Sequence, residues 1–140
     1  MNSNYQKNHL KYWLMIYLTG YTASPPREDL SKTALGSEKV VPWEHFKNPM
    51  DAAKKILKQR ISLVLLEQTV KSKPIYDIQW NFPVCFIVGN EVTGVSEELS
   101  DMADIHAEIP MRGIKQSLNV SVATGVAGYE FSRIYSSLRK

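Results

Sequence analysis

Cysteine is nearly absent from this sequence. Cys85 is the only one among 140 residues, so the chain can form no internal disulfide. It lies within an apolar run, where we expect a buried small hydrophobe rather than a reactive thiol. The histidines, His9, His45 and His106, are scattered, and no cysteine or histidine cluster has the spacing of a zinc site. We therefore expect no bound metal.

Long hydrophobic runs are also lacking. The longest one near the N-terminus, residues 12–18, is too short to span a membrane. It follows a basic stretch, as the core of a signal peptide does, but it is strand-like and no small-residue cleavage site follows it. The net charge of +3 permits contact with a polyanion without arguing for it. We expect an intracellular, cytoplasmic protein that does not enter a membrane.

The residues that are present suit a single globular domain. With 44% hydrophobic and 22% charged residues, a chain of this length can bury a core. We expect one domain across residues 1–140, with an irregular, polar segment at residues 1–11. Apolar runs alternate with helical stretches, which predicts an α/β fold with a parallel sheet flanked by helices.

Local patterns place the elements of that fold. Strands are expected at residues 13–18, 39–41, 62–66, 84–88 and 105–109. Helices are expected after Ser24 and after Ser96, from an Asn48 cap with Pro49 in first position, and over residues 118–138. The last of these contains Gly125 and Gly128, whose small size would let another element approach closely, so we expect this helix to be deeply packed. It also has an apolar stripe at spacings of three and four; its members are Val120, Ala123, Ala127, Phe131, Ile134 and Leu138.

Two loops that follow expected strands are the candidate site. One is Gly-Asn-Glu-Val-Thr-Gly at residues 89–94, and the other is residues 109–119, which lead into the last helix. In an open parallel sheet, ligands bind at the carboxyl ends of the strands. The first loop lacks the glycine patterns of dinucleotide and nucleoside-triphosphate sites. A tight turn without a ligand is therefore an open alternative for it.

The second loop brings polar groups to a helix start. Ser117 is placed to cap the long helix, and Asn119 has two donors and an acceptor that can orient an oxygen-bearing ligand. Arg112 and Lys115 can meet a phosphate backbone, or they are two solvated charges. Gly113 is expected to let the loop turn.

The residues of these loops resemble two motifs of the SpoU/TrmH family, the RNA ribose 2′-O-methyltransferases of the SPOUT class. The first motif is matched by residues 86–96 and the second by residues 109–113 and 117–123, in order and with the family's spacing. Residues 17–22, 32–36 and 65–67 also resemble one branch of the family. The resemblance covers roughly residues 13–139, which is nearly the whole chain.

The resemblance implies a fold with a C-terminal trefoil knot, a homodimer and S-adenosylmethionine as methyl donor. The reaction implied is methyl transfer to a ribose 2′-hydroxyl of tRNA or rRNA, with Arg112 and Lys115 as candidate RNA contacts. By position, the catalytic loops would contribute Glu91, Ser117 and Asn119 as their polar residues. The residues implied to line the donor pocket are Leu66, Gly89, Ile109, Met111 and Leu118.

One family motif has no counterpart. The family's first motif, upstream of the matched region, supplies an arginine thought to help deprotonate the ribose hydroxyl, and no arginine precedes Trp13. General-base assistance is worth roughly 10²- to 10⁴-fold in rate. The alternative is therefore a catalytically impaired module that binds S-adenosylmethionine or RNA.

Overall fold

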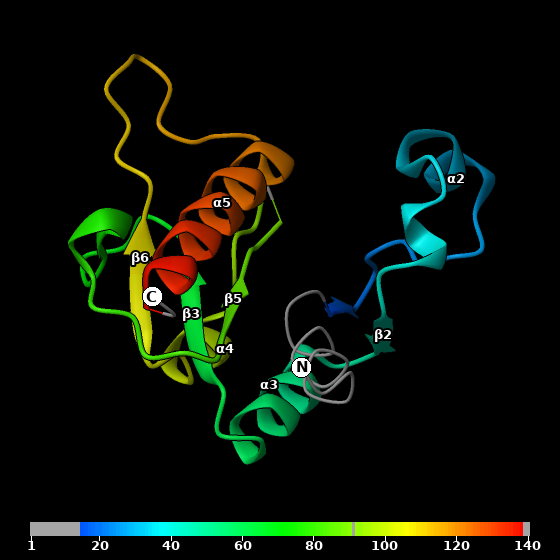
Figure 1. Ribbon diagram of the computed structural model, residues 1–140, viewed down its shortest axis with the longest axis horizontal. Coiled ribbons are helices and arrows are strands. Elements are labelled where there is room, and N and C mark those ends of the chain that lie inside the picture. Colours follow the sequence, from blue (N-terminus) through cyan, green and yellow to red (C-terminus); the bar gives the residue numbers. More distant parts are fainter. Residues whose placement is uncertain (1–14, 91, 139–140) are drawn as a thin grey trace. The chain divides into compact units, whose positions relative to one another are not determined.

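The computed structural model describes residues 15–90 and 92–138 (Figure 1). The chain divides into two compact units, residues 1–54 and residues 55–140, and each is described by itself. The expectation of a single domain across the chain stays a prediction. The irregular segment expected at residues 1–11 lies outside the described residues.

The first unit contains a two-stranded parallel sheet formed by β1 (Ile16–Thr19) and β2 (Trp43–Phe46). Between the strands lie α2 (Glu28–Ala34) and the 3-10 helix η1 (Ser37–Lys39). The strand expected at residues 13–18 is thus present, but its described part is half-exposed rather than buried.

The strand expected at residues 39–41 is wrong. The N–H groups of Val40 and Val41 both donate to the carbonyl oxygen of Ser37, at 3.0 and 2.9 Å. These bonds curl the segment into a helical turn, so its backbone cannot pair with β1. The strand begins instead at Trp43, directly after a proline.

The helix expected after Asn48 is confirmed. It is α3 (Pro49–Lys58), and the side-chain oxygen of Asn48 accepts the N–H of Met50 at 2.9 Å. Such a cap satisfies one of the backbone donors that the first helical turn leaves unpaired. Ala53 and Ile56 are buried on its apolar face.

The second unit is built on a four-stranded sheet in the order β4-β6-β3-β5, in which every pairing is parallel. The expected strands 62–66, 84–88 and 105–109 are confirmed, the last two each one residue shorter. The elements of this unit are β3 (Ser62–Leu66), β4 (Lys73–Pro74), the 3-10 helix η2 (Ile75–Asp77), β5 (Val84–Ile87), α4 (Glu97–Asp101), β6 (Ile105–Glu108) and α5 (Val120–Leu138).

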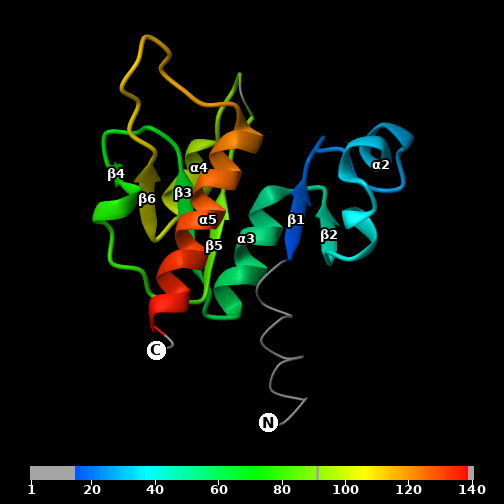
Figure 2. The ribbon, with the colours of Figure 1, turned by 45° about the horizontal axis from the view of Figure 1, so that its top comes forward.

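The core of this unit lies between the sheet and α5, which runs across one face of the sheet (Figure 2). β3 is the most buried strand, because β5 and β6 pair with its two edges. From α5, Ala127 and Phe131 enter the core. The Phe131 ring meets Trp80 edge-on at 4.6 Å between ring centroids and lies 5.2 Å from Phe86.

The deep packing expected for the last helix is only partly correct. Leu138, at the end of the predicted stripe, is 65% exposed. A Cβ added at Gly125 or Gly128 would have no heavy atom within 4 Å, so nothing approaches the helix closely there. The side of α5 away from the sheet also carries exposed apolar residues, including Val126 and Tyr129.

Cys85 is partly buried in β5. Loss of hydration raises the pKa of its thiol to about 11, because burial disfavours the thiolate. The thiol is therefore protonated at neutral pH, which supports the interpretation of Cys85 as an unreactive core residue. Among the helices that are described, none has the length and apolar character needed to cross a bilayer.

Phe131 offers a test of the core. Phe131→Ala should lower the free energy of unfolding by about 3–5 kcal/mol, because it removes the contacts of α5 with the rings of Trp80 and Phe86. Ser136→Ala, at an exposed position of the same helix, should not lower it. Urea unfolding followed by circular dichroism measures both. Equal losses for the two variants would contradict this packing.

Candidate functional site

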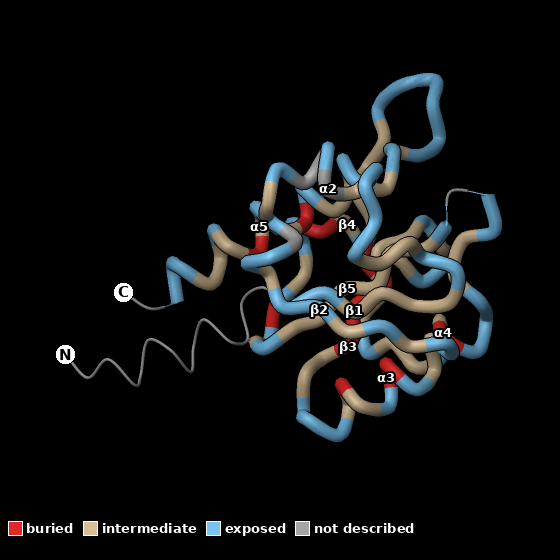
Figure 3. The backbone as a smooth tube through the Cα atoms, turned by 90° about the vertical axis from the view of Figure 1, so that its right-hand side faces the viewer, coloured by how far each residue is buried: buried red, intermediate tan, exposed pale blue. Residues whose placement is uncertain are grey.

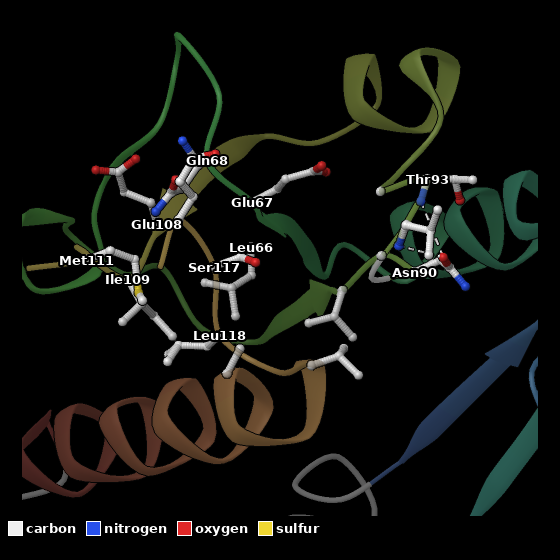
Figure 4. Close-up of a pocket in the computed structure, with 17 residues that line it drawn as sticks. Leu66, Glu67, Gln68, Asn90, Thr93, Glu108, Ile109, Met111, Ser117 and Leu118 are labelled. Carbon is white, nitrogen blue, oxygen red and sulfur yellow. Dashed lines mark hydrogen bonds between the residues drawn. The ribbon is translucent and has the colours of Figure 1, made fainter. Parts of the chain in front are cut away.

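A cavity of about 420 Å³ lies at the carboxyl ends of β3, β5 and β6 (Figure 4). These strands are parallel neighbours, so the loops that follow them all begin at the same edge of the sheet. Residues after each of the three strands line the cavity, and the start of α5 completes the wall. The two loops expected to form a site are therefore brought together.

The first loop is held in shape by Asn90. Its side-chain oxygen accepts the N–H groups of Val92 and Thr93, at 2.8 and 3.2 Å, and its backbone oxygen accepts the N–H of Gly94 at 2.9 Å. An asparagine at the start of a turn commonly bonds in this way. The loop is thus a tight turn and also part of a cavity wall.

Position 89 requires glycine because the loop brings the backbone of Gly94 close to it. A Cβ at Gly89 would lie 2.5 Å from the carbonyl carbon of Gly94 and 2.8 Å from its oxygen. Because those atoms belong to the backbone, they cannot move aside cheaply. Gly94 has a φ of +65°, a conformation that residues with a Cβ rarely adopt. The candidate catalytic residue Glu91 lies outside the described residues.

Asn119, rather than Ser117, caps the last helix. The side-chain oxygen of Asn119 accepts the N–H of Ser121 at 2.9 Å and also the hydroxyl of Ser121. Its backbone oxygen accepts the N–H of Ala123 at 2.9 Å, so α5 begins at Val120. The capping role expected for Ser117 is wrong, and Ser117 lines the cavity instead (Figure 4).

The rest of the second loop is open to solvent. Residues 112–117 are exposed and form the loop at the top of Figure 3. A Cβ at Gly113 would meet no heavy atom within 4 Å, and its φ is not among the positive ones. The turn therefore does not require glycine at this position, contrary to expectation.

The cavity gathers most of the residues singled out from the sequence. All five candidate donor-pocket residues line it, together with Ser117; the five are Leu66, Gly89, Ile109, Met111 and Leu118. Asn119 follows directly in the chain as the helix cap. Arg112 lines a separate groove, and Lys115 is exposed and lines neither.

Sequence reasoning missed several polar residues of the cavity wall, chiefly Glu67, Gln68 and Glu108. Each lies at the carboxyl end of an expected strand, which was the available signal. No lysine, arginine or histidine is found among the described lining residues, so the cavity carries negative charge. Such a wall favours a neutral or cationic ligand over a phosphate. Across residues 15–90 and 92–138, no group of His, Cys, Asp and Glu side chains is arranged to hold a metal ion.

A second groove of about 600 Å³ lies beside the exposed face of α5. Val126 and Tyr129 line it from the helix, and Arg112 lines it from the second loop. Glu130 and Arg133 form an ion pair at 2.7 Å along its wall. The hydrogen bonds from Arg133 lower the pKa of the Glu130 carboxyl.

Comparisons with known proteins converge on one family. Residues 13–129 match the SpoU rRNA Methylase family. The sequence is 34% identical over 120 residues to a tRNA (guanosine(18)-2'-O)-methyltransferase of Aquifex aeolicus, covering 85% of this chain and 57% of that protein. The chain spans about half the length of the curated relatives it matches.

Solved structures support the same family. The fold is similar to the A. aeolicus TrmH/SpoU tRNA modifying enzyme, with a TM-score of 0.75, 29% identity, and coverage of 95% of this chain and 70% of that one. It is also similar to an AdoMet-bound rRNA methyltransferase from Sinorhizobium meliloti, with a TM-score of 0.73 and 29% identity, over 84% of this chain and 44% of that one.

The glycines of the two loops provide a matched test of the site geometry. Gly89→Ala should lower the free energy of unfolding by about 1–3 kcal/mol, because the new methyl group overlaps backbone atoms of Gly94. Gly113→Ala should leave it unchanged or raise it by up to about 1 kcal/mol, because the position is open and the unfolded chain loses freedom. Urea unfolding compares the two. A neutral Gly89→Ala would show that the loop does not return as described.

Proposed function

We propose that this chain, which belongs to the SpoU rRNA methylase family, transfers a methyl group from S-adenosylmethionine to a ribose 2′-hydroxyl of tRNA or rRNA. The observation that carries the proposal is the cavity in which all five candidate donor-pocket residues meet. The names of the A. aeolicus and S. meliloti relatives support both the reaction and the substrate class. A cytoplasmic location is proposed with it, since the proposed substrates are tRNA and rRNA.

The chemistry of the cavity suits this donor. S-adenosylmethionine carries a positively charged sulfonium, and Glu108 supplies negative charge in the described wall. Backbone groups near Gly89, Ile109 and Leu118 would bind its adenine and ribose. Methyl transfer would be an in-line displacement: the ribose 2′-hydroxyl would lose its proton to solvent, its oxygen would bond to the methyl carbon, the carbon–sulfur bond would break, and sulfur would keep the electron pair. Orienting the two reactants supplies much of the acceleration of such a reaction.

Asn119 can act on the substrate through one group only. Its oxygen accepts bonds from Ser121, so its NH₂ is the group that would contact a substrate, as a donor. Ser117 would face the donor from the cavity wall, with Glu91 as the third polar residue of the catalytic loops. Arg112 and Lys115, both exposed on the second loop, would contact the phosphates of the RNA.

We also propose a single SPOUT domain with a C-terminal trefoil knot. The family match spans both compact units, which supports one domain. The similarity to the A. aeolicus enzyme over 95% of this chain supports the family's knot. A crystal structure with S-adenosylmethionine bound tests the knot and the cavity together, through the path of the chain at residues 109–119 and the position of the donor.

The activity itself is tested with a labelled methyl donor. Incubation with S-adenosylmethionine and total tRNA or rRNA should give labelled 2′-O-methyl nucleosides after digestion. Calorimetry on the same sample measures donor binding. Binding without transfer would favour the alternative of an impaired binding module, to which the comparisons lend no support, and absence of binding would overturn the proposal.

Two substitutions of Asn119 test its role as a helix cap separately from its proposed contact with the substrate. Asn119→Asp keeps an oxygen that caps α5 but removes the NH₂, so it should retain the native stability and lose transfer by at least about 10-fold. Asn119→Ala should lose the same activity and also about 1 kcal/mol of stability. Single-turnover rates and urea unfolding measure the two effects. Full activity in Asn119→Asp would exclude a contact between the NH₂ and the substrate.

A homodimer is proposed through the exposed face of α5. Val122, Val126 and Tyr129 lie on one side of the helix and are 50%, 42% and 82% exposed. An apolar surface of this kind beside a groove commonly marks an interface.

The oligomeric state tests this interface. Val126→Glu should shift the chain from dimer to monomer, because a carboxylate would be buried without a partner. Val70→Glu, at a fully exposed valine outside this face, should leave the dimer intact. Sedimentation velocity distinguishes the species. A native chain that is monomeric at micromolar concentration would contradict the proposal.

A further inference from the structure

Glu67 leaves the sheet in a fixed direction. Its backbone N–H donates to the carbonyl oxygen of Ala107 in β6 at 3.0 Å. Its own carbonyl oxygen accepts the hydroxyl of Ser72 at 2.6 Å. Both backbone groups are therefore bonded at the point where β3 ends. The side chain projects from an anchored backbone rather than from a mobile loop.

The side chain of Glu67 reaches across to the first loop (Figure 4). Its Oε2 accepts the N–H of Val95 at 3.3 Å. Its Oε1 occupies the space that a Cβ would need at Gly94. The absence of a side chain at Gly94 thus makes room for this carboxylate, in addition to permitting the positive φ.

The bonds of the first loop have two different effects. Those made by Asn90 to Val92, Thr93 and Gly94 stay within the loop, so they fix its shape but not its place. The bond from Val95 to Glu67 joins the loop to the segment that follows β3. This bond therefore fixes the position of the loop relative to the rest of the cavity wall.

We propose that Glu67 is a positioning residue, which holds the end of the first loop, at Gly94 and the following Val95, against the cavity so that the donor-binding wall is complete before the donor arrives. The expected effect of Glu67 on donor binding rests on the proposed function. The contact itself involves only residues of this chain. Prearranging a loop in its bound conformation raises affinity, because the donor need not order it.

A direct electrostatic role for the Glu67 carboxylate would behave differently. Glu67→Gln removes the charge but keeps a side-chain oxygen that can accept the N–H of Val95. A positioning role is therefore rescued by glutamine, whereas attraction of a cationic donor is not. Glu67→Ala removes both.

The test uses the full chain with Glu67→Ala and Glu67→Gln. Glu98→Ala is the control, because it removes a carboxylate of the same unit that is exposed and lies outside the cavity wall. Hydrogen exchange at the Val95 amide is measured without donor. The dissociation constant for S-adenosylmethionine is measured by calorimetry. We expect Glu67→Ala to speed exchange at Val95 and to weaken donor binding about 3- to 10-fold, the effect of one hydrogen bond. Glu67→Gln should stay within about twofold of the native chain in both measurements, and Glu98→Ala should match it.

Gly94→Ala provides a reciprocal test. Its methyl group should displace the Glu67 carboxylate and so speed exchange at Val95 as Glu67→Ala does. In the double variant Glu67→Ala, Gly94→Ala, the alanine at position 94 no longer overlaps a glutamate at position 67. The combined loss of affinity for S-adenosylmethionine should therefore be smaller than the product of the two single losses. Purely multiplicative losses would contradict a direct coupling.

The outcomes separate this inference from the proposed function. If the native chain fails to bind S-adenosylmethionine, the proposed function fails, and exchange at Val95 still decides whether Glu67 holds the loop. If the donor binds but Glu67→Ala leaves affinity and exchange unchanged, the positioning role is overturned. If glutamine performs as poorly as alanine, the carboxylate charge acts directly and the positioning role is likewise wrong.

Discussion

The parallel pairing of β3 with both β5 and β6 is the constraint on which the rest of the second unit depends. Val64 lies opposite Phe86 on one side and Ile105 on the other. This register ends the three strands at one edge, and their loops meet there because strand direction leaves no other place for them. A cavity lined from four separate segments of the chain follows from it.

α5 joins the stability of this unit to its site. Phe131, near the middle of the helix, packs on Trp80 and Phe86, while the first turn of the helix closes the cavity. The side-chain oxygen of Asn119 fixes the start of this helix. In the proposed reaction its NH₂ would contact the substrate, so a change to the cap would affect both the fold and the reaction.

The two loops achieve their positions by different means. The first is short and bonded to itself through Asn90, and Gly89 and Gly94 are needed for its close return. The second is longer and exposed over residues 112–117, and it is anchored where α5 begins. A closed wall on one side and an open one on the other would suit the proposed reaction, in which a small donor meets a large RNA.

The sequence by itself determined the features whose causes are local. Asn48 and Pro49 start a helix because the side-chain oxygen of Asn48 caps the first turn and the fixed φ of proline suits its first position. The apolar runs of β3, β5 and β6 mark strands because they must leave water. The residues that the family motifs implied for a donor pocket all line one cavity, and their role in binding a donor stays a prediction. Only the tertiary structure decided the remainder. The clearest case is the reach of Glu67 to Val95, which joins residues 28 positions apart. The turn at Val40 and the cap at Asn119 use near neighbours, but the sequence offered more than one local partner for each, and the folded backbone decided which one is bonded. A side chain's own sequence neighbours do not contain that information, because the partner is chosen by distance in space.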